Sequence, residues 1–284
     1  MAILLYCCIL LTTVTQSAST KQYQRVAHNA AAFNALKASS ACLLFGLLCI
    51  GHFTFHLSTM LYGLGYGALM CLSMYAGFRA LGLGPMSLTS LIVSFSVVLP
   101  LLYGLAFCHE ELSLFKGLGL AALVVALIAA NVGKGHASQQ KTDYPKWIFF
   151  ILLTFLSNGF CSVLQKQHQL LYPGLYLSEF MLFAMLVCMI VFLAIAAVQI
   201  KPNQLRALRG KRYGLLSGIT NGLANYCTLA LSGMENASVL FPAISAGTIL
   251  LSLLCGMVIF RERLRAPHWL ALGAGILAVV FLKL

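Results

Sequence analysis

Long uncharged apolar runs alternate along the chain with short breaks that hold most of the charged residues. From Gly84 to Cys108 there is no Asp, Glu, Lys or Arg, and the run then stops at His109-Glu110-Glu111. An α-helix needs about 20 apolar residues to cross a bilayer. The pattern therefore predicts ten membrane helices: Ala2–Thr20, Ala27–Ile50, Thr59–Leu81, Gly84–Leu112, Leu112–Val132, Trp147–Gln165, Leu175–Ile200, Tyr213–Ser232, Asn236–Phe260 and Pro267–Leu284. We interpret the first run as a helix rather than a signal peptide, because no basic residues precede it.

The two halves of the chain resemble each other. Sliding the sequence by 152 positions puts Gly104 on Gly256 and Glu110 on Glu262, and the break between two apolar runs coincides. The pattern indicates a duplication, with a first five-helix repeat at 1–132, a hydrophilic linker at 133–146 and a second five-helix repeat at 147–284. Because five is odd, the second repeat must enter the membrane from the opposite side. We predict an all-α integral membrane protein with ten transmembrane helices in two inverted repeats.

Composition and charge agree with a membrane protein. Charged residues make up 8% of the chain, whereas a soluble domain has about a quarter. Lysines and arginines gather in alternate connections, 15 against 3, which predicts a cell-membrane protein with both termini outside the cytoplasm. The net charge of +12 fits anionic lipid as a partner; no basic cluster with interleaved aromatics predicts nucleic-acid binding.

Polar side chains inside apolar helices are candidates for a substrate cavity, because polar groups are costly in hydrocarbon. For Ser and Thr, helix packing is the stronger interpretation; for buried amides we favour cavity lining. The predicted cavity residues are Asn158, Gln165, Asn221, Asn225, Ser90, Ser94, Ser245, Thr248 and Tyr66. These neutral groups suit a polar solute that is uncharged or zwitterionic. Pro100 and Pro242 are candidate hinges, because proline interrupts the hydrogen bonds of a helix.

Charged groups within the apolar runs are few. Glu179 could carry a coupling proton, or it could be an interfacial carboxylate paired with Lys166 or Lys201. Lys37 could bind an anionic group, but we favour the interpretation that it extends to the membrane surface. The glutamates of the two sequence breaks, Glu110, Glu111 and Glu262, are expected to cap the following helix or to pair with Arg261 and Arg263.

The repeated breaks resemble a known family. Gly104-x5-Glu110-Glu111-Leu112 and Gly256-x4-Arg261-Glu262-Arg263-Leu264 are similar to the turn between the fourth and fifth helices of each repeat in EamA-type members of the drug/metabolite transporter superfamily. The resemblance extends over nearly the whole chain. It implies ten transmembrane helices, a central cavity and alternating access for small organic solutes. Common members place both termini in the cytoplasm, opposite to the prediction from charge here.

Three functions remain to be weighed. We favour a secondary transporter of a small organic metabolite or drug, driven by protons or by exchange. A flippase for a lipid-linked intermediate is the alternative. An integral membrane enzyme is less favoured, because the chain has one Asp and neither HExxH nor GxSxG. No cofactor or metal is predicted. Glycine-rich helix faces would permit a homodimer.

Overall fold

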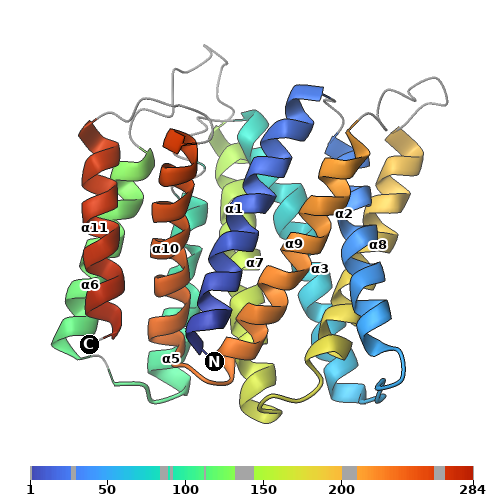
Figure 1. The fold of residues 1–284 in the computed structure, drawn as a ribbon, viewed down its shortest axis with the longest axis horizontal. Coiled ribbons are helices and arrows are strands. Elements are labelled where there is room, and N and C mark those ends of the chain that lie inside the picture. The colour runs from blue at the N-terminus through green and yellow to red at the C-terminus, as the bar shows by residue number, and fades with distance from the viewer. Residues whose placement is uncertain are drawn as a thin grey trace. The chain divides into compact units, whose positions relative to one another are not determined.

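The computed structural model describes residues 2–26, 30–83, 89, 92–111, 113–131, 144–199, 210–258 and 266–283. Within these ranges the chain is helical and contains no strand (Figure 1). The helices are α1 (Ala2–Val26), α2 (Ala30–Cys49), α3 (Leu57–Leu83), the 3-10 turn η1 (Phe95–Val97), α5 (Val98–Phe107), α6 (Leu114–Asn131), α7 (Tyr144–Leu171), α8 (Leu177–Gln199), α9 (Lys211–Ser232), α10 (Ala237–Val258) and α11 (Ala266–Lys283). The all-helical prediction is confirmed for this part of the chain.

Several helices extend beyond the apolar runs that predicted them. Helix α1 continues from Thr20 to Val26, and α7 begins at Tyr144 and continues past Gln165 to Leu171. Hydropathy indicates where the hydrocarbon ends, whereas a helix continues as long as its backbone hydrogen bonds do. The first turn of α7 thus includes the end of the predicted linker, with Pro145 at the second position, where a missing N–H costs little.

Six helices are long and apolar enough to cross a membrane: α1, α2, α3, α7, α8 and α10. Three shorter apolar helices cover Ile92–Phe107, Leu114–Ala130 and Ala266–Leu282. Leu43 and Leu47 on α2 are each 67% exposed, as are many other large apolar side chains, and such a surface suits lipid better than water.

The fourth predicted helix is interrupted. Between Ile92 and Phe107 the backbone tightens into η1 before α5 begins. Pro100, which is buried, follows directly as the third residue of α5. Because proline has no N–H to donate to the carbonyl four residues earlier, an irregular turn at this point has a local cause.

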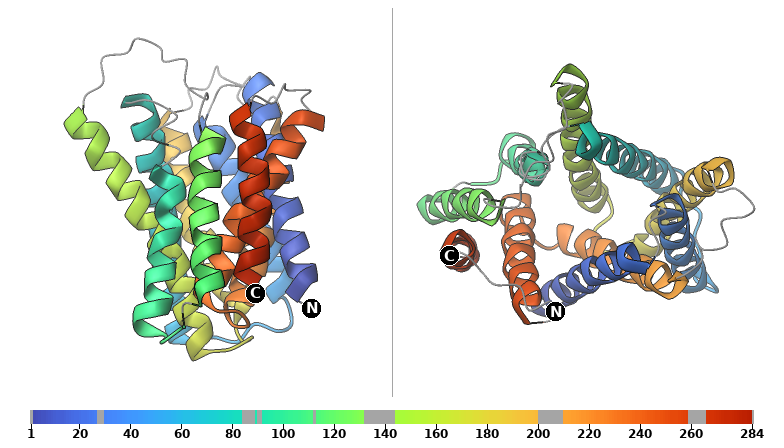
Figure 2. Two further views of the ribbon diagram at one scale, coloured as in Figure 1. Left: turned by 90° about the vertical axis from the view of Figure 1, so that its left-hand side faces the viewer. Right: turned by 90° about the horizontal axis from the view of Figure 1, so that it is seen from above.

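The described helices gather into two compact units. Unit 1 comprises residues 1–71 and 167–234, and unit 2 comprises residues 72–166 and 235–284. In unit 1, α2 packs against α8 and α9, and α1 packs against α9. In unit 2, α11 packs against α6 and α10, and both views of Figure 2 show α6 and α11 side by side. Each unit therefore contains helices from both halves of the sequence.

Glycines bring pairs of helices in unit 1 unusually close. A Cβ at Gly67 of α3 would lie 2.5 Å from the Ala184 carbonyl oxygen of α8, and one at Gly63 would lie 2.8 Å from the Phe180 carbonyl oxygen. On α9, a Cβ at Gly218 would overlap the Lys37 carbonyl oxygen and the Ser40 hydroxyl of α2. Small residues spaced by four allow such backbone contact between membrane helices. These glycines therefore form helix–helix contacts inside unit 1.

Unit 2 is held together by small clusters of apolar side chains. Leu123 and Leu127 of α6 pack with Ala246 of α10 and Ala278 of α11. The indole N–H of Trp147 donates to the Thr89 hydroxyl at 2.9 Å, so the polar end of this buried ring is satisfied.

We expect Gly218→Ala to destabilise the protein by about 1–3 kcal/mol, because its methyl group would push α9 away from α2. Thermal unfolding in detergent measures the effect. The matched control is Gly46→Ala on α2, where a Cβ meets nothing within 4 Å and alanine favours the helix. Equal melting temperatures for the two variants would contradict this account of the contact.

Candidate functional site

Helix α3 and helix α9 are joined by a partly buried polar contact between two predicted cavity residues. The Tyr66 hydroxyl donates to Asn225 Oδ1 at 2.8 Å, and Asn225 Nδ2 donates to the Asn221 carbonyl oxygen at 2.8 Å. Tyr66 is 4% exposed and Asn221 is 7% exposed. These three residues therefore form one polar cluster in the interior of unit 1.

Two side chains of α9, Asn221 in this cluster and Ser217 beside it, have no hydrogen-bond partner in the part of the chain that the structure describes. The Asn221 side chain makes no hydrogen bond there, although the residue is buried. The Ser217 hydroxyl, one helical turn earlier on α9, is fully buried and also unpaired. Buried polar groups normally find partners, so unpaired ones require an explanation. A bound polar molecule would supply the missing hydrogen bonds.

A second polar network lies at one end of unit 1, around the fully buried His168. Its Nε2 lies 3.1 Å from the Thr59 hydroxyl, which in turn lies 3.3 Å from His56 Nδ1. Gln169 Nε2 lies 3.0 Å from His168 Nδ1. The network joins α7, α3 and the residue that precedes α3.

The hydrogen bonds of Gln169 determine the tautomer of His168. Its Oε1 accepts from the Gly174 backbone N–H at 2.9 Å, and its Nε2 donates to the Leu175 carbonyl at 3.3 Å. The positions of the Gln169 amide oxygen and nitrogen are therefore fixed and cannot be exchanged. Its Nε2 must also donate to His168 Nδ1. His168 is thus the neutral ring that donates from Nε2 to Thr59. Both ring nitrogens of His168 and the whole amide of Gln169 are thus paired, which indicates a structural role.

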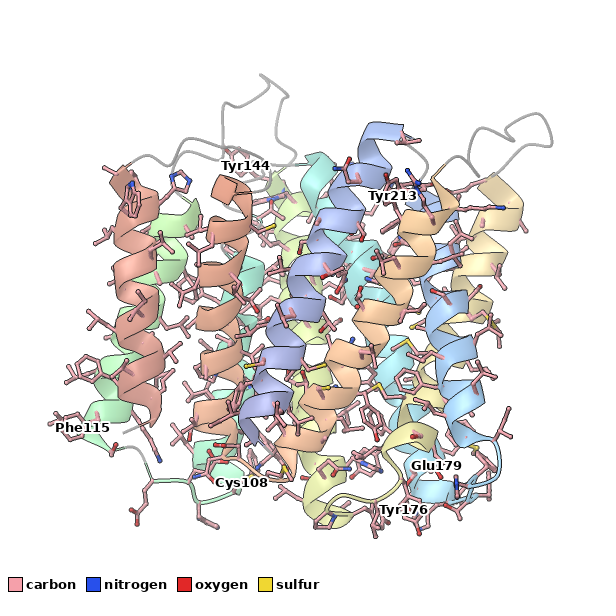
Figure 3. The ribbon with its side chains drawn as sticks, viewed as in Figure 1. Cys108, Phe115, Tyr144, Tyr176, Glu179 and Tyr213 are labelled. Carbon is pink, nitrogen blue, oxygen red and sulfur yellow. The ribbon has the colours of Figure 1, made fainter. Side chains whose placement is uncertain are left out.

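Glu179 lies at the same end of unit 1, in the first turn of α8. It is 7% exposed, and its Oε1 accepts from the backbone N–H and the hydroxyl of Thr54, each at 3.2 Å. Figure 3 shows Glu179 and Tyr176 at this end, and Tyr213 at the other. The carboxylate is held by Thr54 in the connection between α2 and α3. Lys201, one of its two predicted partners, lies outside the described residues.

In unit 2, Glu110 caps the beginning of α10. Its two carboxylate oxygens accept from the backbone N–H groups of Ala237 and Ser238, at 2.7 and 2.8 Å. Lys166 Nζ lies 4.0 Å from Glu110 and donates to the Glu235 carbonyl at 2.8 Å. A carboxylate is favoured at a helix N-terminus, where N–H groups lack partners. The expectation that Glu110 caps the following helix was wrong: it caps a helix distant in sequence.

The glycine at position 104, shortly before the sequence break, is required for a steric reason. A Cβ there would lie 2.7 Å from Glu110 Oε2 and 3.1 Å from the Ala237 Cβ, so glycine leaves the space that the carboxylate occupies.

Burial raises the pKa of the adjacent Cys108 thiol, and the Glu110 carboxylate raises it further, outweighing the opposite effect of Lys166. Cys108, labelled in Figure 3, therefore remains a neutral thiol.

The other predicted cavity residues lie in unit 2 and do not form one cluster among the described contacts. Asn158 of α7 donates to the Ser96 hydroxyl at 2.9 Å, next to η1. Gln165 is 3% exposed, and Pro242 is buried inside α10. Ser94, Ser245 and Thr248 are partly buried, and Ser90 lies outside the described residues. In the part that the structure describes, no three His, Cys, Asp or Glu side chains could hold a metal ion.

Sequence reasoning missed the network around His168. The seven histidines showed no common spacing, and His168 and His56 are brought together only by the packing of α7 against the beginning of α3. The only signal was a histidine and a glutamine adjacent in an apolar helix.

Comparison with known proteins identifies the family. Residues 145–284 match the model of the EamA-like transporter family. The second half of the chain belongs to this family. No curated protein sequence matches it significantly.

The fold of the EamA-like chain is also known from solved structures, of which 28 chains match. One, described only as "Crystal structure of protein", is 15% identical, with a TM-score of 0.78, over 99% of this chain and 95% of that chain. At this identity the likeness shows the fold alone. The family and the six long apolar helices make the protein a multi-pass membrane protein of a transporter family.

For this EamA-like protein we expect Glu110→Gln to lower stability by about 1–3 kcal/mol, because an amide N–H₂ would face a backbone N–H of α10. Glu111→Gln, which alters an exposed carboxylate, should change it by less than about 0.5 kcal/mol. Chemical or thermal unfolding in detergent would compare them. Similar losses in both variants would show that general charge, rather than the cap, matters.

Proposed function

We propose that the chain is a secondary active transporter that moves a small, polar organic solute across the cell membrane by alternating access. The family match over residues 145–284 supports a transporter. The resemblance of the two halves supports inverted five-helix repeats, the arrangement found in many secondary transporters. The Lys/Arg bias supports an orientation with both termini outside the cytoplasm.

The observation that carries the proposal is the amide of Asn221 in the interior of unit 1, which has no hydrogen-bond partner among the described residues. Its neighbours Tyr66 and Asn225 bond to each other and to the α9 backbone, so they are already satisfied and hold the surroundings of Asn221 in place. An amide offers two donors and one acceptor, which suits hydroxyl, carbonyl or amine groups. Transport also requires that the solute can leave, and a few neutral hydrogen bonds give binding of that modest strength.

The first experiment is a thermal-stability screen of the detergent-purified protein against sugars, nucleosides, amino acids, polyamines and cationic drugs. A solute present at 100 times its dissociation constant should stabilise by about 2.7 kcal/mol. We expect Asn221→Ala to weaken the response to the stabilising solute by about tenfold, because one or two hydrogen bonds are lost.

Gln199→Ala is the matched control, because it removes an exposed amide at the end of α8. A solute whose effect survives Asn221→Ala unchanged would exclude Asn221 from the site. If no water-soluble compound acts and a lipid-linked compound does, the protein is a flippase instead.

We also propose that Glu179 carries the coupling proton. It is a buried carboxylate in an apolar helix, and its only described partners are the Thr54 N–H and hydroxyl, so protonation would break no ion pair in that part of the chain. In proteoliposomes, Glu179→Gln should bind the stabilising solute normally yet lose transport driven by a pH gradient, while solute exchange persists. Gradient-driven transport that survives the substitution would rule out this role.

A further inference from the structure

Lys37 of α2 faces the interior of unit 1. Ala41, one helical turn further on the same face, is fully buried and packs on Gly222 of α9. The exposed face of α2 is a different one, marked by Leu43 and Leu47. Lys37 itself is only partly buried. Its side chain therefore begins on the side of α2 where Ala41 packs on α9.

The backbone at Lys37 is firmly held. The Ser40 hydroxyl lies 3.1 Å from both the Lys37 carbonyl oxygen and the Leu215 carbonyl oxygen of α9. Gly218 allows α9 to approach the same carbonyl. The backbone of Lys37 is thus held in a close contact between two helices.

Helix α2 packs against α8 as well as α9, and α8 carries the buried Cys188. Cys188 Sγ lies 3.6 Å from Cys71 Sγ and 3.7 Å from the Gly67 carbonyl oxygen, next to Tyr66 on α3. Helix α2 therefore packs against the two helices, α8 and α9, that surround Tyr66 of α3 and carry Asn221 and Asn225.

No acidic group pairs with Lys37 in the part of the chain that the structure describes. The contrast with Lys166, which lies 4.0 Å from Glu110 and donates to a carbonyl, is informative. The buried acid of unit 1, Glu179, is held by Thr54. An ammonium among apolar helices without a counter-ion is costly, and such residues usually mark the path of a substrate or ion.

We propose that Lys37 binds a carboxylate group of the transported solute. The inference rests on the proposed function and narrows the solute to a compound with one acidic group, whose neutral part meets Asn221. Lysine suits this role because it is a compact charge with three donors. Snorkelling to a lipid head group, the interpretation favoured from sequence, fits less well with a side chain on the protein-facing side of α2.

Pairs of acids and amides of the same shape test the proposal: benzoate with benzamide, nicotinate with nicotinamide, and lactate with lactamide. Thermal stability is measured in a neutral detergent for the wild-type protein, Lys37→Met, Lys37→Gln and Lys37→Arg. We expect at least one acid to stabilise the wild type and Lys37→Arg while its amide binds more weakly. Both neutral variants should weaken binding of the acid by about 10- to 100-fold and leave binding of the amide unchanged.

The matched control is Lys116→Met, which removes an ammonium that donates to the Glu111 carbonyl at the beginning of α6. It should leave the preference for the acid intact. Equal stabilisation by acid and amide in the wild type, or no effect of any acid, would overturn the proposal even if a neutral variant failed to fold. Stabilisation by phosphatidylglycerol in mixed micelles that depends on Lys37, without an acid effect, would assign the residue to lipid instead.

The two proposals can fail separately. If neutral solutes bind in a manner that depends on Asn221 but acids are not preferred, the proposed transport function is supported and the carboxylate site at Lys37 is refuted. If no solute of any charge binds in the screen and none is transported in proteoliposomes, the proposed function itself fails.

Discussion

The contact of glycine with a neighbouring backbone is the constraint on which unit 1 depends. Lipid chains are as apolar as the helices, so burial of apolar surface gives helices little reason to associate within a membrane. Close van der Waals contact must supply the attraction, and Gly67 and Gly218 permit it by leaving space for the carbonyl oxygens of Ala184 and Lys37. The same closeness lets the Tyr66 hydroxyl reach Asn225 at 2.8 Å. The positions of polar side chains in the unit therefore depend on glycines, which have no functional group of their own.

The polar groups of the chain separate into satisfied and unsatisfied ones. Both ring nitrogens of His168 and both carboxylate oxygens of Glu110 have partners. Asn221 and Lys37 are different: each lies in a helix that packs closely on its neighbours, yet no hydrogen bond to their polar ends is found among the described residues. The first kind stabilises helix ends and connections. The second kind costs free energy unless something else binds.

The sequence predicted the helices well because hydropathy is a local property. It predicted hydrogen-bond partners poorly because these lie far apart in the sequence. Tyr66 and Asn225 were both placed in a cavity, but only the fold shows that they bond to each other. Glu110 lies 127 residues from Ala237, whose backbone N–H donates to it. Spacing in the sequence could therefore not reveal which helix Glu110 caps. For Lys37, periodicity indicates a face of the helix but not what covers that face. Ser90 and the second break, at Glu262, lie outside the described residues and stay predictions.

The duplication predicted from sequence gives the glycines of unit 1 a further meaning. Sliding the chain by 155 positions puts Gly63 on Gly218 and Gly67 on Gly222, so α3 meets α8 through the same spacing by which α9 meets α2. The residue between each pair is not repeated: Tyr66 falls on Asn221, and both are buried. A repeated contact requires glycines at repeated positions, but it does not require these two side chains to differ. The close helix contacts alone therefore do not account for the difference between Tyr66 and Asn221, two buried polar positions of a repeated framework.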